Sequence, residues 1–267
     1  MDFQKAFQTN KETWEQKVAI HAASDFYFME DFKKGKSSLN SYEVKALGDV
    51  NGKSLLHLQC HFGQDTLSWS RLGANCTGVD ISEEGVKLAR ALNEELQLDA
   101  TFACCNVLEA SQHISETFDI VFTSYGTIGW LPNLKPWAAM IAERLKPGGV
   151  FYIVEFHPIA WMYDYTVSPP EMKYAYHQKE AIYEEYEGTY AEDEGSTKMI
   201  SKEYGWNHSL SDVIGSLLEA GLTIESFNEY DSSPYDVFPD LVKNKEGMFE
   251  LKEKMYPLLF EVKAVKK

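Results

Sequence analysis

The stretch SLLHLQCHFGQD, residues 54–65, decides the fold class. Ser54–Gln59 is a short, mostly apolar run, which predicts a buried strand. The tight connection Phe62-Gly63-Gln64 follows, and Asp65 can cap a helix that runs to about Leu72. A strand, a tight turn and a helix in this order are the first part of a βαβ unit.

The same order repeats further along the chain. Ser82 and the acids after it predict the start of a second helix, because a hydroxyl caps free N–H groups and acids favour a helix N-terminus. Strands alternating with helices at this spacing predict a parallel sheet covered on both faces. The further predicted strands are Cys76–Ile81, Thr101–Cys104, Phe118–Ser124, Val150–Phe156, Thr223–Glu229 and Pro257–Val265, with later helices at about Lys135–Leu145 and Ser211–Ala220.

Composition excludes several classes of partner. The chain has 267 residues and a formal net charge of −16, so its surface repels nucleic-acid phosphates and anionic lipid. It has no apolar run of the ~18 residues that a membrane-spanning helix needs, and its polar N-terminus does not resemble a signal peptide. Four cysteines, two of them adjacent, do not make a secreted disulfide framework in a chain of this length. We therefore predict no nucleic-acid partner, no membrane partner and a cytoplasmic location.

Two segments fall outside the βα pattern. Residues 158–207 are rich in Tyr and Glu, and we interpret them as a cap insertion between the fifth strand and the following helix. Two extended stretches within this segment suggest a hairpin around Glu192–Gly195. Residues 1–45 predict an amphipathic helical cover that carries several aromatic side chains. We expect residues 1–267 to form a single domain.

The strand order predicts where a ligand binds. In open α/β sheets, ligands lie beyond the carboxyl ends of the strands, at the point where the strand order reverses. Asp80 ends the second strand, 17 residues after Gly63. A carboxylate at this position can accept hydrogen bonds from both hydroxyls of a ribose. The alternative is that Asp80 only caps the helix beginning near Ser82.

Several motifs together resemble a known family. LLHLQCHFGQD, GVDISEEGVKLAR, FDIVFTSYGTIGWL and LKPGGVFYIVEFHP are similar to consecutive motifs of class I S-adenosylmethionine-dependent methyltransferases. The resemblance covers Ser54 to about Pro158. It implies a doubly wound, mostly parallel seven-stranded α/β sheet of order 3-2-1-4-5-7-6 with strand 7 antiparallel. It also implies S-adenosylmethionine as cofactor and S-adenosylhomocysteine as product.

The first loop departs from the family pattern, which is an acid followed by three alternating glycines. Here His57 replaces the acid, Gln59 and His61 replace two glycines, and only Gly63 remains. Gln59 could hold the amino or carboxylate group of the cofactor. His57 cannot supply the usual negative charge unless another acid compensates. A loop this bulky also argues against a dinucleotide, whose pyrophosphate prefers glycine-rich backbone N–H groups.

The resemblance assigns further contacts with the cofactor. Asn106 would accept from the adenine amino group, the Val107 amide would meet a ring nitrogen, and Ile81 would pack on the adenine. Tyr125 would lie under the methionine part of the cofactor. Asn106 could instead be an ordinary turn residue and Tyr125 a packed loop aromatic. The predicted cofactor-binding residues are Gln59, Cys60, His61, Phe62, Gly63, Asp65, Asp80, Ile81, Asn106, Val107 and Ser124.

Three residues are candidates for the chemistry. His157, two residues after Glu155 at the end of the fifth strand, and His208, after the insertion, could each act as a base if the acceptor must lose a proton. Tyr125 completes the set. His157 could instead be a strand-end histidine bonded to backbone, and His208 could belong to a helix cap. The sequence has no paired C-x-x-C or H-E-x-x-H, so we predict no metal site.

These observations favour methyl transfer to a small organic acceptor by in-line displacement. The aromatic, acidic insertion suits a neutral or cationic acceptor, although its tyrosines could instead form a hydrophobic cluster or the surface of a homodimer. One alternative is a non-catalytic binding or interaction protein on the same fold, and another is a nicotinamide oxidoreductase.

Overall fold

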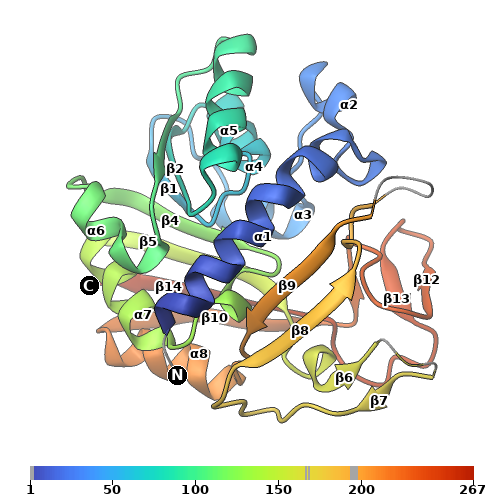
Figure 1. Ribbon diagram of the computed structural model, residues 1–267. Helices are drawn as coiled ribbons and strands as arrows, with labels where there is room; N and C mark the ends of the chain where they lie inside the picture. The colour runs from blue at the N-terminus through green and yellow to red at the C-terminus, as the bar shows by residue number, and fades with distance from the viewer. Residues whose placement is uncertain (1–2, 166, 168, 193–197) are drawn as a thin grey trace.

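The computed structural model describes residues 3–165, 167, 169–192 and 198–267, and is centred on one large sheet (Figure 1). Its seven strands have the order β10-β14-β5-β4-β1-β2-β3, and β14 runs antiparallel to both of its neighbours. This is the predicted order 3-2-1-4-5-7-6 with an antiparallel seventh strand, so the predicted fold class is confirmed. The strands are β1 (Ser54–Leu58), β2 (Asn75–Asp80), β3 (Thr101–Cys104), β4 (Phe118–Ser124), β5 (Leu145–Phe156), β10 (Leu222–Tyr230) and β14 (Leu259–Lys266).

Helices cover both faces of this sheet, and alternate strand residues separate the two cores. Leu55 belongs to the apolar core under α3 (Ser41–Leu47), α4 (Gln64–Arg71) and α5 (Glu83–Glu95). Leu56, the next residue, belongs to the core under α6 (Ala110–His113), α7 (Leu134–Arg144) and α8 (Leu210–Glu219). Such a strand is apolar on both sides, which explains the continuous apolar runs in the sequence.

The helix signals in the sequence act as predicted, and one strand starts earlier than predicted. The Ser82 hydroxyl accepts from the Gly85 N–H at 2.9 Å and caps α5. The helix α7 ends at Arg144, but β5 begins already at Leu145, because Leu145 pairs with Phe118 of β4 and the register then shifts before Val150 pairs with Ile120.

The N-terminal cover begins with α1 (Phe3–Ala23), followed by η1 (Asp25–Tyr27) and α2 (Met29–Lys33). Side chains of α1 bond to the backbone of β9 (Ile200–Gly205). The Asn10 amide accepts from the Tyr204 N–H and donates to the Tyr204 carbonyl, both at 2.8 Å. Thr13 donates to the Lys202 carbonyl at 2.7 Å. These contacts satisfy an edge strand that would otherwise expose unpaired polar groups.

The strand β9 pairs antiparallel with β8 (Ile182–Glu187), so the two extended stretches of the insertion form a hairpin. The predicted turn around Glu192–Gly195 falls largely in residues 193–197, which lie outside the described residues. Two short strands, β6 (Tyr163–Asp164) and β7 (Glu171–Met172), precede the hairpin. A further small sheet was not predicted from the sequence, since its strands are only two or three residues long: β11 (Ser232–Ser233), β12 (Leu241–Lys243) and β13 (Phe249–Leu251).

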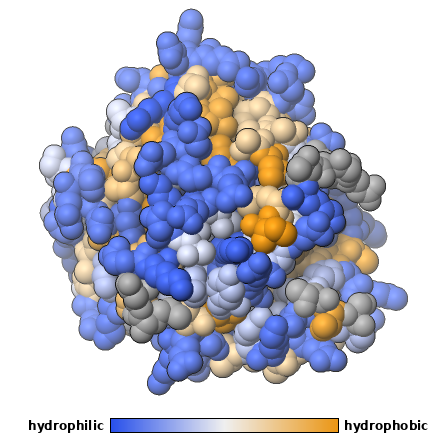
Figure 2. All heavy atoms as spheres, in the orientation of Figure 1, coloured by the Kyte–Doolittle hydropathy of each residue, from blue (hydrophilic) through white to orange (hydrophobic). Residues whose placement is uncertain are grey.

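The hairpin and α1 lie side by side over one face of the molecule (Figure 1). Figure 2 shows that hydrophilic residues cover most of this face. No described helix is both long and apolar enough to cross a membrane.

Gly63 provides a test of the packing that positions the first loop. Its φ is +80°, and a Cβ there would lie 2.8 Å from Phe102 and 2.9 Å from Ala89. Gly148 has a similar φ of +78° with no atom within 4 Å, so it is a matched control. We expect Gly148→Ala to lower the free energy of unfolding by about 1 kcal/mol and Gly63→Ala by about 2–4 kcal/mol, because the second adds a clash to the backbone strain. Chemical denaturation measures both, and equal losses would contradict this view of the loop.

Candidate functional site

The loop between β1 and α4 keeps a glycine-like backbone without most of the glycines. Gln59, His61 and Gly63 have φ angles of 54°, 52° and 80°, in the left-handed region. These are the positions aligned with the three glycines of the family pattern. Left-handed backbone costs a non-glycine residue about 1–2 kcal/mol, and such strain clusters at functional sites. The residues at positions 59 and 61 therefore hold a backbone conformation that glycine adopts more freely.

Hydrogen bonds stabilise the strained positions. The His61 N–H donates to the Asp80 carboxylate at 2.7 Å, and the Ser82 N–H donates to the other oxygen of Asp80 at 2.9 Å. The Gln59 side chain donates from Nε2 to the Thr127 carbonyl at 2.8 Å. Asp80 thus joins the first and second loops, and Gln59 joins the first loop to the segment after β4.

A cavity of roughly 1400 Å³ opens at the carboxyl ends of β1, β2, β3 and β4. This exceeds the ~300–1,000 Å³ of an ordinary small-molecule site, so a cofactor and an acceptor could share it. The predicted site residues that line it are Gln59, Cys60, His61, Phe62, Gly63, Asp65, Asp80, Ile81, Asn106, Val107, Ser124, Tyr125 and His208. The sequence therefore identified residues that the fold brings together, while their individual roles stay predictions.

Asp80 and Asn106 each have a structural role in a loop and also line the cavity. Burial raises the pKa of Asp80 to about 6, and hydrogen bonds from backbone N–H groups oppose that rise. The Asn106 oxygen accepts from the Leu108 N–H at 3.0 Å, as a turn residue does. Both residues nevertheless line the cavity, and each oxygen retains capacity for another hydrogen bond.

His157 is not among the residues that line the cavity. Its Nε2 bonds to Glu229 at 2.8 Å, and its Nδ1 accepts from the Ile159 N–H at 3.2 Å. The chain leaves the sheet after Phe156, and the His157 N–H donates to the Leu258 carbonyl at 2.8 Å, so its side chain faces β10. His157 therefore lies away from the cavity, and a role for it as a base stays an untested prediction.

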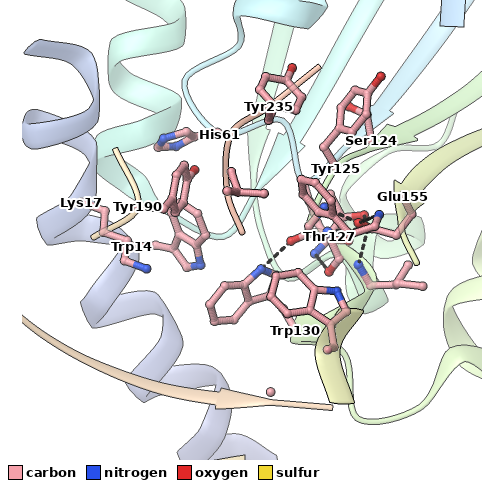
Figure 3. Close-up of a pocket in the computed structure, with 18 of the residues that line it drawn as sticks. Trp14, Lys17, His61, Ser124, Tyr125, Thr127, Trp130, Glu155, Tyr190 and Tyr235 are labelled. Atoms are coloured by element: carbon pink, nitrogen blue, oxygen red, sulfur yellow. Dashed lines mark hydrogen bonds between the residues drawn. The ribbon is translucent and has the colours of Figure 1, made fainter. Parts of the chain in front are cut away.

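Glu155 organises the segment after β4 instead. Its carboxylate accepts from the backbone N–H groups of Gly126, Thr127 and Ile128, the last two at 2.7 and 3.3 Å. Burial raises the pKa of this carboxyl, and the backbone hydrogen bonds oppose the rise. The Trp130 indole donates to the Gly126 carbonyl at 2.7 Å (Figure 3). This network fixes the backbone at Tyr125 and Gly126, which are also left-handed.

A buried lysine within an aromatic group lines the cavity beneath the cap. Lys17 is 1% exposed and forms an ion pair with Glu203 of β9. Its ammonium lies 4.9 Å from the ring centre of Trp14 and 5.7 Å from that of Trp130. Figure 3 shows Lys17 and Trp14 extending from α1 into the pocket that Trp130 also lines. This constellation was missed because its members are far apart in sequence and carry no motif.

Two histidines connect the cover, the first loop and the cap. His21 Nδ1 lies 3.1 Å from His61 Nε2, and His21 Nε2 lies 2.7 Å from the Thr189 hydroxyl. Burial lowers the pKa of His21 to about 3 and lowers that of His61 as well, so both rings are neutral near pH 7. A hydrogen bond between neutral rings is compatible with a buried setting.

Two acids lie at the wall between the first loop and the cover. Asp65 lines the cavity and accepts from the hydroxyls of Ser38 at 2.6 Å and Ser124 at 3.4 Å. Glu43 is fully buried and accepts from the Asn40 N–H at 2.6 Å and the Tyr125 hydroxyl at 3.0 Å. Burial raises the pKa of Asp65 to about 6, and burial followed by the nearby charge of Asp65 raises that of Glu43 to about 8.

The described residues contain no group of three or more His, Cys, Asp or Glu side chains arranged to hold a metal ion. All four cysteines have free thiols, including the adjacent Cys104 and Cys105.

Glu43 gives a prediction for the pH dependence of stability. Its folded-state pKa lies above its unfolded value, so its contribution to stability is lost as pH rises from about 4.5 to about 8. Glu43→Gln keeps the helix-capping hydrogen bonds of α3 and removes this loss. We expect the variant to unfold at nearly the wild-type temperature at pH 4.5 and to be more stable at pH 8, by on the order of 2–4 kcal/mol. Thermal melts across this range measure the difference, and a constant difference would rule out the assignment.

Comparison with known proteins agrees with this geometry. Residues 56–153 match the methyltransferase domain family. Among curated proteins, the chain is 25% identical over 124 residues to the ubiquinone biosynthesis O-methyltransferase of Alkalilimnicola ehrlichii, covering 46% of this chain and 50% of that protein. It is 31% identical over 103 residues to the protein of that name from Idiomarina loihiensis, covering 38% and 41%. The chain thus spans about half the length of the curated relatives it matches.

Solved structures extend the likeness to nearly the whole chain. An S-adenosylmethionine-dependent methyltransferase from Clostridium acetobutylicum superposes with a TM-score of 0.57 at 14% identity, covering 92% of this chain and 94% of that one. At this identity the likeness shows a shared fold. Together, the domain match over residues 56–153, the strand order and the solved structures show that the chain shares the fold of S-adenosylmethionine-dependent methyltransferases and resembles them in sequence over its central part.

Proposed function

We propose that the protein transfers a methyl group from S-adenosylmethionine to a small organic acceptor and releases S-adenosylhomocysteine. One observation carries the proposal: the first loop keeps three left-handed residues beside Asp80, at the mouth of a large cavity. Gln59 and His61 adopt this strained backbone although neither is glycine, which is expected if the path of the backbone serves a ligand. The residues present therefore fit the cofactor.

S-adenosylmethionine supplies a methyl group on a positively charged sulfur, which is reactive without help from a metal. The protein's part is to orient and desolvate the reactants. In this proposal Asp80 binds the ribose hydroxyls, and Ile81, Asn106 and Val107 hold the adenine. Glu155 holds the segment at Tyr125 and Gly126 in place under the methionine part.

The acceptor would bind between the ends of β4 and β5 and the aromatic cap. Trp14, Trp130 and Phe156 line this side of the cavity, together with the Lys17–Glu203 pair. Because that lysine is already neutralised, the cavity retains an excess of acids, which favours a neutral or cationic acceptor. The curated relatives act in ubiquinone biosynthesis by name, but the match covers only half of their length, so the acceptor is not carried over.

His208 is the better placed of the two candidate bases. It lines the cavity, and its Nε2 lies 2.6 Å from the Leu131 carbonyl, to which it can only donate. The neutral ring then carries its lone pair on Nδ1. Burial lowers the pKa of His208, so the ring stays neutral and able to accept a proton at pH 7. An acceptor that must lose a proton could pass it to this nitrogen.

The non-catalytic alternative rests on the bulky residues at positions 59 and 61. It predicts no methyl transfer and no response to a change at Asp80. A cytoplasmic location and a homodimer remain further proposals.

S-adenosylhomocysteine should raise the melting temperature of the wild type, because it binds only the folded state. At 100 times Kd the gain is about 2.7 kcal/mol. We expect Asp80→Ala to weaken this ligand by roughly 10–100-fold through loss of hydrogen bonds to a charged group. Asp236→Ala, an acid that also lines the cavity but follows β11, is the control. No shift with millimolar ligand, or stabilisation by NAD instead, would refute the proposal.

A comparison of His208→Gln with His157→Gln tests the assignment of the base. The product S-adenosylhomocysteine is measured with a panel of small amines and phenols. For an acceptor that must lose a proton, we expect His208→Gln to lower kcat by about 10²–10⁴-fold and His157→Gln to leave it within a few fold. As the pH is lowered, the wild-type rate should fall only below pH 6.5, the ordinary pKa of histidine, because the pKa of His208 is lowered. Equal losses in both variants would reject His208 as the base.

A further inference from the structure

The cofactor cavity lacks the negative charge that the family pattern places at position 57. His57 is buried, and its Nδ1 lies 2.8 Å from the Thr66 hydroxyl. Burial lowers the pKa of His57 to about 3, so the ring is neutral near pH 7. The methionine part of the proposed cofactor carries an α-ammonium group. A cation entering a low-dielectric site needs a carboxylate or several hydrogen-bond acceptors.

Asp65 is linked through its neighbour Thr66 to His57, the residue at the position of the family's acid. It is adjacent in sequence to Thr66, the partner of His57, and lies in the first turn of α4. Its carboxylate faces the cavity and accepts only neutral hydroxyls, from Ser38 and Ser124. In the described part of the chain, no lysine or arginine pairs with Asp65 or with Glu43 behind it. Two neighbouring acids thus share a buried wall that holds no cation.

Gln59 supplies an independent sign that a donor is missing. Its Nε2 donates to the Thr127 carbonyl, which leaves Oε1 as the free end of the amide. This oxygen is buried and has no hydrogen-bond partner among the described residues. Buried polar atoms without a partner are rare in folded proteins and call for an explanation. An ammonium group, with three N–H donors, would satisfy such an oxygen.

Two other acids that line the cavity, Asp80 and Glu155, already accept hydrogen bonds from backbone N–H groups. Asp80 accepts from the backbone N–H groups of His61 and Ser82. Glu155 accepts from the backbone after β4. Their negative charge stabilises loop conformations, whereas among the described residues Asp65 accepts from hydroxyl groups and has neither a backbone donor nor a cation.

We propose that Asp65, with Gln59 Oε1 beside it and Glu43 behind it, binds the α-ammonium of the cofactor's methionine part and so replaces the acid missing at position 57. The proposal rests on the proposed function, because it assumes that S-adenosylmethionine occupies the cavity. Asp65 has a binding role here and takes no part in the methyl transfer step.

Two nucleosides that differ only in the amino-acid part test this. S-adenosylhomocysteine carries the α-ammonium, whereas 5′-methylthioadenosine lacks the amino-acid part. Calorimetry on the full chain measures Kd for both with wild type and Asp65→Asn, a nearly isosteric change. We expect the variant to bind S-adenosylhomocysteine roughly 10–100-fold more weakly and methylthioadenosine within about two-fold of wild type. Asp164→Asn is the matched control, because Asp164 lines the same cavity from the cap and pairs with Lys173 at 2.6 Å. This control should change neither Kd.

Lowering the pH gives a second measurement on the unmodified protein. Wild-type affinity for S-adenosylhomocysteine should fall as Asp65 is protonated, below about pH 6, and methylthioadenosine should show a smaller fall. The difference between the two ligands should vanish in Asp65→Asn.

The outcomes separate this proposal from the proposed function. Equal weakening of both ligands in Asp65→Asn would mean that Asp65 only maintains the fold of the site, and no weakening would mean that the ammonium binds elsewhere. Either result overturns the role of Asp65 and leaves the proposed function intact. Failure of the wild type to bind either nucleoside would overturn the proposed function, and this proposal with it.

Discussion

The left-handed backbone between β1 and α4 is the constraint on which the site depends. Three positions in five residues, Gln59, His61 and Gly63, adopt a conformation that glycine accepts freely and other residues resist. Only Gly63 is irreplaceable on packing grounds, because Phe102 and Ala89 occupy the space beside it. At the other two positions the space is open enough for a side chain, and hydrogen bonds to Asp80 and Thr127 offset the strain. The fold therefore requires the path of the loop, and glycine is one of several ways to achieve it.

The side chains that replace glycine also change what surrounds the cavity. A glycine at position 61 could not contact the N-terminal cover, whereas His61 bonds to His21 of α1, and His21 bonds to Thr189. The helix α1 in turn holds β9 through Asn10 and Thr13. The cover and the cap are thus linked to the cofactor loop by specific polar contacts. The side chain at position 61 therefore takes part in joining the cover and the cap to the cavity.

Strands, helix caps and loop positions could be predicted from the sequence because they depend on local patterns. Contacts between residues far apart in the chain could not. The apolar strands and the Ser82 cap follow from local rules, and the order of motifs placed Asp80, Asn106 and Ser124 at one cavity. The Lys17–Glu203 pair joins residues 186 positions apart, which no local rule connects. The contact between His157 and Glu229 joins residues 72 positions apart, and no local pattern in the sequence indicates it. The small sheet formed by β11, β12 and β13 was missed because such short strands carry no periodic signal.

Some of the acidic residues of the chain lie in the interior of the structure, at the wall of the cavity. The net charge of −16 excludes polyanionic partners because it makes the outer surface repel them. Two of the acids lie inside: burial raises the pKa of Asp65 to about 6, so this group is ionised at neutral pH, and raises that of Glu43 to about 8, so this group is mostly protonated. Acids whose pKa is raised in the folded state oppose folding at neutral pH. The same groups favour any cation that enters, because binding removes their unpaired charge. The free-energy cost of burying these acids and the selectivity of the site for a positively charged ligand therefore have one physical cause.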